Sequence, residues 1–89
     1  MKHDMVLYDF IREHGLDFST DLRIKDTKFY DIWKPTFLGR KKIFGLQYIF
    51  GKTNKEISIL IYTTDEDDLF RELKKKLEEA EYKVYVSLS

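Results

Sequence analysis

The segment with the most recognisable chemistry is KPTFLGRKKIFGLQYIFGKT at positions 34–53, which ends in GKT. A phosphate-binding loop has two glycines about four residues apart, then Lys and Ser or Thr, between a strand and a helix. Here the five residues LQYIF separate Gly45 from Gly51, and the sequence after Lys52-Thr53 is patterned as a strand. Bulky side chains at those positions would hinder the approach of backbone N–H groups to a phosphate. The segment therefore predicts a hairpin, in which Gly45 marks a bulge or a close backbone approach.

The acidic run from Asp65 to Asp68 is a second candidate site, because carboxylates bind Mg²⁺ and Ca²⁺. It lacks the alternating oxygen ligands, the central glycine and the distal Glu of a calcium loop. Successive residues of a helix also point in different directions. We interpret the run as the first turn of a helix, where the positive end of the helix dipole favours acidic side chains. The same run would offer a contact to a basic partner.

Catalytic groups are scarce in this sequence. His3 and His14 are eleven positions apart, which is about 16 Å along a helix and too far for both to hold one metal ion. Cysteine is absent, which excludes thiolate catalysis and disulfides. There is no nucleophile elbow and no HExxH pattern, and no motif is specific enough to assign a family. We therefore expect no catalytic residue, no metal and no cofactor, and predict that the protein is not an enzyme.

Basic and aromatic residues are interleaved between positions 25 and 42. The candidate partner-binding residues in this segment are Tyr30, Trp33, Lys34, Arg40, Lys41 and Lys42. Because Trp, Tyr and Arg are common anchors of protein interfaces, Tyr30 and Trp33 are the predicted anchors and the basic triplet is the predicted rim. This pattern predicts a small interaction protein that binds, and inhibits or regulates, a protein partner.

The same segment has two other interpretations. In a nucleic-acid-binding module, its basic side chains would neutralise phosphates while exposed aromatic rings stack on bases. In the plainest interpretation, Phe29, Trp33 and Phe37 belong to the core and the basic triplet keeps a turn soluble. A free sheet edge is a further candidate interface, through which two copies would pair as a homodimer.

The charge distribution favours a protein partner over nucleic acid. The chain has 89 residues and a formal net charge of zero, with 11 Lys/Arg against 7 Asp/Glu in residues 1–55 and 5 against 9 in residues 56–89. A basic chain would have indicated nucleic acid, whereas these two halves can neutralise each other in the fold. Apolar runs are far shorter than the roughly 18 residues of a membrane helix, and the first residues do not resemble a signal peptide. We expect no membrane contact and a cytoplasmic location.

Hydrophobic periodicity predicts the elements that position these residues. It indicates helices at about 4–14 and 65–81, and strands at about 18–25, 28–33, 43–50, 57–63 and 82–88. Thr64 is the expected cap of the second helix. Pro35 should end regular structure because it has no N–H, which leaves residues 34–42 as a loop. The prediction is one α+β domain over residues 1–89, in the order α-β-β-β-β-α-β, with a mixed, mainly antiparallel sheet and its helices packed on one face.

Overall fold

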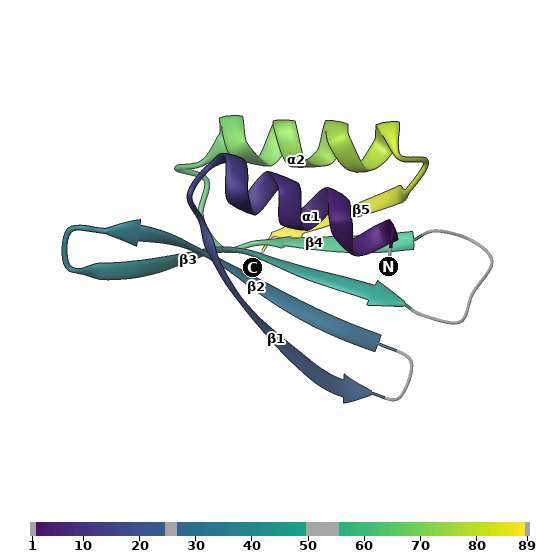
Figure 1. Cartoon of the computed structure of the whole chain (residues 1–89), viewed down its shortest axis with the longest axis horizontal. Coiled ribbons are helices and arrows are strands. Elements are labelled where there is room, and N and C mark those ends of the chain that lie inside the picture. Colours follow the sequence, from purple (N-terminus) through teal and green to yellow (C-terminus); the bar gives the residue numbers. More distant parts are fainter. Residues whose placement is uncertain (1, 25–26, 50–55, 89) are drawn as a thin grey trace.

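A computed structural model describes residues 2–24, 27–49 and 56–88. These residues form two helices and five strands in the predicted order α-β-β-β-β-α-β (Figure 1). The elements are α1 (Lys2–Glu13), β1 (Asp17–Ile24), β2 (Thr27–Thr36), β3 (Gly39–Ile49), β4 (Glu56–Ile61), α2 (Asp67–Glu79) and β5 (Lys83–Leu88). The predicted hairpin loop at residues 51–55 lies outside the described residues.

The five strands form one mixed sheet in the order β1-β2-β3-β4-β5. The first four strands are antiparallel neighbours. Strand β5 pairs with β4 in parallel, and α2 connects the two strands. Both helices lie on the same side of the sheet, as predicted (Figure 1). We call this side the helix face and the opposite side the open face.

The core lies between the helices and the helix face. Successive strand residues point to opposite faces, so alternating apolar residues give the sheet one side that the helices can cover. Each large apolar side chain that leaves water in this way contributes about 1.5–3 kcal/mol. The core side chains are Leu7, Phe10, Ile11, Leu16, Tyr30, Ile32, Ile43, Phe44, Leu46, Tyr48, Ile57, Ile59, Leu73, Leu77 and Tyr82.

Strands β2 and β3 extend beyond the rest of the sheet as a two-stranded hairpin, which we call the arm (residues 33–42; Figure 1). The prediction that Pro35 ends regular structure is wrong, because β2 continues to Thr36 and Pro35 pairs with Arg40. Strand β1 begins at Asp17, opposite Trp33, so among the described strands β3 alone neighbours β2 from Lys34 onward. Proline is tolerated in such a position, where its missing N–H breaks no second ladder.

The second helix begins later than predicted. Its first residue is Asp67, and Glu66 occupies the N-cap position without a side-chain capping bond, so Thr64 is not the cap. Instead, the hydroxyl of Thr63 accepts a hydrogen bond from the backbone N–H of Asp65 at 3.2 Å, which shapes the turn before the helix. Asp67 and Asp68 lie in the first turn, where the helix dipole favours carboxylates. Within the described residues, neither helix is long and apolar enough to cross a membrane.

Candidate interaction surface

The fold separates the six candidate partner-binding residues into three groups. Tyr30 forms the first group, because its side chain is 0% exposed and lies on the helix face. Its ring packs against the rings of Tyr8 and Tyr48, with centroids 6.3 and 5.5 Å away. Tyr30 is therefore a core residue, and its ring has no surface to offer a partner.

Trp33 lies only three residues further along β2, but it belongs to the open face. The ladder between β2 and β3 shifts at this point, since Ile32 pairs with Phe44 while Trp33 pairs with Lys42. Ile43 is the additional residue of this bulge, and its side chain is fully buried. The bulge lets two consecutive residues, Ile43 and Phe44, enter the core while Lys42 stays on the open face with Trp33.

Trp33, Arg40 and Lys42 form the second group, a cation–aromatic cluster on the open face. The Arg40 guanidinium carbon lies 4.5 Å from the centroid of the Trp33 ring, and Lys42 Nζ lies 5.4 Å from it. Lys42 Nζ also lies 4.9 Å from the ring centroid of Tyr62. The indole N–H of Trp33 donates a hydrogen bond to Ser19 Oγ at 3.2 Å. Cations within about 6 Å of a ring are attracted to it, so these contacts hold the basic side chains against the sheet.

Lys34 and Lys41 form the third group, on the helix-face side of the arm. They are ladder partners, and each pairs with a carboxylate that precedes α2. Lys34 Nζ lies 2.8 Å from Glu66 Oε2, and Lys41 Nζ lies 2.9 Å from Asp65 Oδ2. The Lys41 ammonium lowers the pKa of Asp65 through this hydrogen bond and its charge. Part of the acidic run is therefore matched to part of the basic segment within the molecule.

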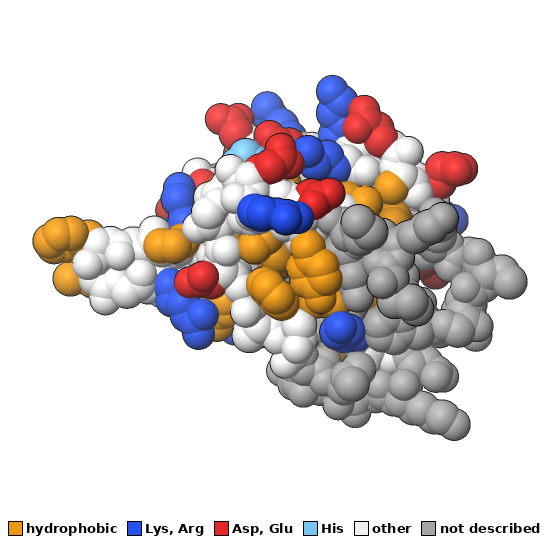
Figure 2. Space-filling view, viewed as in Figure 1, with side chains coloured by type: hydrophobic (Ala, Val, Ile, Leu, Met, Phe, Trp, Pro, Cys, Tyr) orange, Lys and Arg blue, Asp and Glu red, His pale blue; other side chains and the backbone are white. Residues whose placement is uncertain are grey.

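The tip of the arm is the most exposed apolar surface in the described chain. Phe37 is 100% exposed and Leu38 is 94% exposed (Figure 2, orange at the far left). They are the two residues between Thr36 and Gly39, which pair to close the hairpin. The interpretation of Phe37 as a core residue is wrong, because its side chain is fully exposed and none of the described elements covers it. The signal in the sequence was Phe-Leu placed between two turn-forming residues, Pro35 and Gly39.

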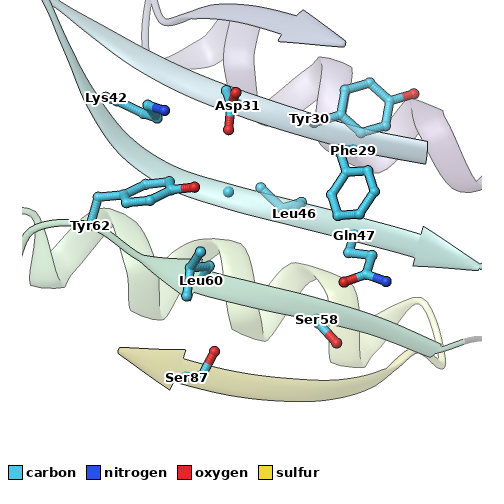
Figure 3. Close-up of a pocket in the computed structure, with 11 residues that line it drawn as sticks. Phe29, Tyr30, Asp31, Lys42, Leu46, Gln47, Ser58, Leu60, Tyr62 and Ser87 are labelled. Atoms are coloured by element: carbon cyan, nitrogen blue, oxygen red, sulfur yellow. The ribbon is translucent and has the colours of Figure 1, made fainter. Parts of the chain in front are cut away.

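A pocket of about 250 Å³ lies on the open face beside the cation–aromatic cluster (Figure 3). Its polar lining residues are Asp31, Lys42, Gln47, Ser58, Tyr62 and Ser87. The Tyr62 ring lies over Gly45, where an added Cβ would be 3.1 Å from two ring-end atoms. The prediction of a bulge or a close backbone approach at Gly45 is therefore wrong, because the bulge lies at Ile43 and the group that approaches Gly45 is the side chain of Tyr62. The pocket extends the surface around Lys42 toward β5 and adds hydrogen-bonding groups to it.

Comparisons of the chain with protein-family models, with curated proteins and with solved structures give no match. The described residues contain no group of three or more His, Cys, Asp or Glu side chains that could hold a metal ion. The exposed arm tip and the cation–aromatic cluster behind it form the candidate interaction surface.

Proposed function

We propose that this protein is a non-enzymatic interaction module that binds a protein partner through the arm, and inhibits or regulates that partner. Phe37 and Leu38 would insert into an apolar site of the partner, with Trp33, Arg40 and Lys42 forming the contact behind them. The observation that carries this proposal is the complete exposure of two large apolar side chains at the arm tip.

Folding gives no reason for these two residues at a turn. The central positions of tight turns favour Gly, Pro, Asn, Asp and Ser, for which each has a conformational or hydrogen-bonding reason. Phe37 and Leu38 bury almost no surface in the described structure. Covering each of them in a complex would contribute about 1.5–3 kcal/mol, which is the scale of an interface hot spot.

The charges of the arm support a protein partner over the alternative, a nucleic-acid-binding module using residues 25–42. Lys34 and Lys41 already have carboxylate partners. Arg40 and Lys42 are the basic arm residues left on the open face, and both lie against Trp33. Affinity for nucleic acid comes mainly from the number of phosphates that basic side chains neutralise, and each internal pair reduces that number.

The test is a pull-down from the native cell with the wild-type chain and with the double variant Phe37→Ser/Leu38→Ser. We expect a protein that remains bound after nuclease treatment and that the variant loses. In a titration with the purified partner, the variant should bind about 30-fold more weakly or worse, which corresponds to about 2 kcal/mol.

The matched control is Lys75→Ser/Glu79→Ser, which changes two exposed residues of α2 without altering the net charge. It should retain the partner, and all three proteins should unfold at the same temperature. Equal retention by the tip variant would contradict the proposal. Binding that disappears with nuclease, or that falls steeply with salt and is abolished by Arg40→Glu/Lys42→Glu, would favour the nucleic-acid alternative.

A further inference from the structure

The two edges of the sheet differ in how well they resist pairing with another chain. Strand β1 carries three charged residues in DFSTDLRI, and its ladder with β2 is irregular between Asp21 and Ile24. Charges and irregularities are the usual protection of an edge strand. Strand β5 pairs with β4 on one side, and no described strand lies on its other side. The β1 edge is protected, so the β5 edge is where an added strand would bind.

Strand β5 has little protection. Its sequence KVYVSL has one charged residue, Lys83, at its first position. The ammonium of Lys83 lies 5.5 Å from the ring centroid of Tyr85, on the open face. Beyond Lys83 the strand is uncharged, and Tyr85, Val86 and Leu88 are exposed large hydrophobic residues. An uncharged, regular strand with a free row of N–H and C=O groups is a template for another strand.

We propose that β5 pairs antiparallel with β5 of a second copy of this chain, about a two-fold axis at Val86. In this register Val86 lies opposite its own counterpart and Val84 lies opposite Leu88 of the second copy. The ladder partners of these residues on β4 are Ile57, Ile59 and Ile61, so Val84, Val86 and Leu88 share the helix face. All helix-face pairs across the new junction are therefore apolar.

The same register also gives compatible side-chain pairs on the open face and keeps like charges apart. Tyr85 lies opposite Ser87 of the second copy, so a hydroxyl meets the edge of an aromatic ring. The two Lys83 residues are at opposite ends of the new ladder, about 20 Å apart at 3.3 Å per residue, and no like charges face each other. This self-complementarity is what a two-fold interface requires, and it favours a second copy over an unrelated strand.

The protected β1 edge limits the assembly to two chains. Pairing through β5 about a two-fold axis perpendicular to the sheet gives one continuous sheet, with both copies' helices on one side and both open faces on the other. Its outer edges are then the two β1 strands, whose charges and irregular ladder block further addition. A protein with two unprotected edges would instead form open fibres. This proposal uses a different surface from the arm and does not depend on the proposed function.

The test is the mass of the full chain by sedimentation equilibrium from micromolar to millimolar concentration. We expect a reversible dimer, with a dissociation constant on the order of micromolar because an edge-strand interface is small. Val86→Lys places two like charges opposite each other on the axis, and should remove the dimer. The matched control is Thr20→Lys, which adds the same charge at an exposed helix-face position of the other edge strand, opposite Tyr30, and should leave the dimer intact.

A second measurement keeps the proposal falsifiable if Val86→Lys fails to fold. The chain has no cysteine, so a single introduced thiol reports on its own surroundings. Under mild oxidation, Val86→Cys should form a disulfide-linked dimer at least about tenfold faster than Thr20→Cys, because opposite residues on an antiparallel ladder approach disulfide distance. A monomeric wild type at all concentrations would overturn the proposal. So would a dimer that folded Val86→Lys retains, capture of a foreign strand by monomeric β5, or equal crosslinking of the two cysteine variants.

Discussion

The hairpin formed by β2 and β3 has two parts that share a ladder but differ in almost everything else. In its base, between Thr27 and Ile32 on β2, helix-face side chains such as Tyr30 and Ile32 are completely buried. In the arm, the apolar residues Phe37 and Leu38 are almost completely exposed. Both parts are rich in aromatic residues. Residue type therefore does not decide which side chains serve the fold and which are left for other contacts.

What changes between the base and the arm is the number of neighbouring elements. Strand β1 begins opposite Trp33, and the paired part of β4 ends at Ile61, opposite Phe44. Both neighbours therefore stop near the same level of the hairpin. Beyond it, side-chain contacts tie β2 and β3 to the rest of the described chain: the ion pairs to the α2 start, the hydrogen bond from Trp33 to Ser19 and the contact of Lys42 with Tyr62. A buried aromatic residue in the base therefore stabilises the domain, whereas an aromatic residue at the arm tip stays exposed.

The largest effect should come from removing an aromatic ring from the base. Tyr30→Ala deletes a fully buried ring that packs between α1 and the sheet. Truncation of a large buried side chain costs about 3–5 kcal/mol. That is a large part of the total stability of a domain of this size. Urea unfolding followed by circular dichroism should show a strongly reduced midpoint or an unfolded chain.

The matched change in the arm is Phe37→Ala, which removes a ring of similar size. Because Phe37 is fully exposed, the free energy of unfolding should change by less than about 0.5 kcal/mol. A similar loss of stability in both variants would show that the arm tip is packed in solution, and the distinction between base and arm would then fail.

A second prediction sharpens the comparison through two glycines of β3. Gly45, in the base, needs space, because a Cβ would come within 3.1 Å of Tyr62. A Cβ at Gly39, in the arm, would meet no other described residue within 4 Å, but Gly39 has a φ of +149°, which other residues rarely adopt. Because the Tyr62 ring crowds Gly45, Gly45→Ala should couple to Tyr62→Ala by about 1 kcal/mol in a double-mutant cycle of unfolding free energies.

In the Tyr62→Ala background the crowding is gone, and Gly45→Ala should stabilise the protein by about 0.5–1 kcal/mol through its lower backbone entropy when unfolded. Gly39→Ala should destabilise both backgrounds equally, since its cost is conformational. If Gly45→Ala had the same effect with and without the Tyr62 ring, the close approach over Gly45 would not be a feature of the protein in solution.

Local periodicity was enough to predict most of the fold. The alternation of Phe44, Leu46 and Tyr48 and the helical stripe that includes Leu73 and Leu77 predicted the element order and the covered face. These signals depend on residues close in sequence, so no knowledge of the tertiary structure is needed to interpret them.

The candidate site could be predicted only in part, because it depends on where other strands end. The rule that excludes proline applies to strands with two neighbours, and nothing near Pro35 indicates that β1 stops opposite Trp33. The bulge at Ile43 shifts by one residue the alternation of β3 side chains between the two faces of the sheet. A prediction that assumes a strict period of two therefore cannot place the residues beyond the bulge on the correct face. The pairing of Lys34 with Glu66 joins residues 32 positions apart, so charge balance alone could suggest neutralisation but not the partners.

The smallest predicted effect concerns the ion pairs that tie the arm to the turn before α2. Lys41 lowers the pKa of Asp65 below its ordinary value of 3.8. A carboxyl pKa that is lower in the folded state stabilises that state at pH values above the pKa of the unfolded chain. This contribution is lost as the pH falls through the pKa of the folded state.

Asp65→Asn should therefore be slightly less stable than the wild type at pH 7. The difference should shrink below about pH 4 and in high salt, because the pair is exposed and screened. In a Lys41→Gln background the ion pair is already absent, so thermal unfolding should show a smaller loss from Asp65→Asn there than in the wild type. If the effect of Asp65→Asn grew at low pH, the loss would not come from this ion pair, and an effect that rivalled that of Tyr30→Ala would show that the ion pair contributes as much to stability as core packing does.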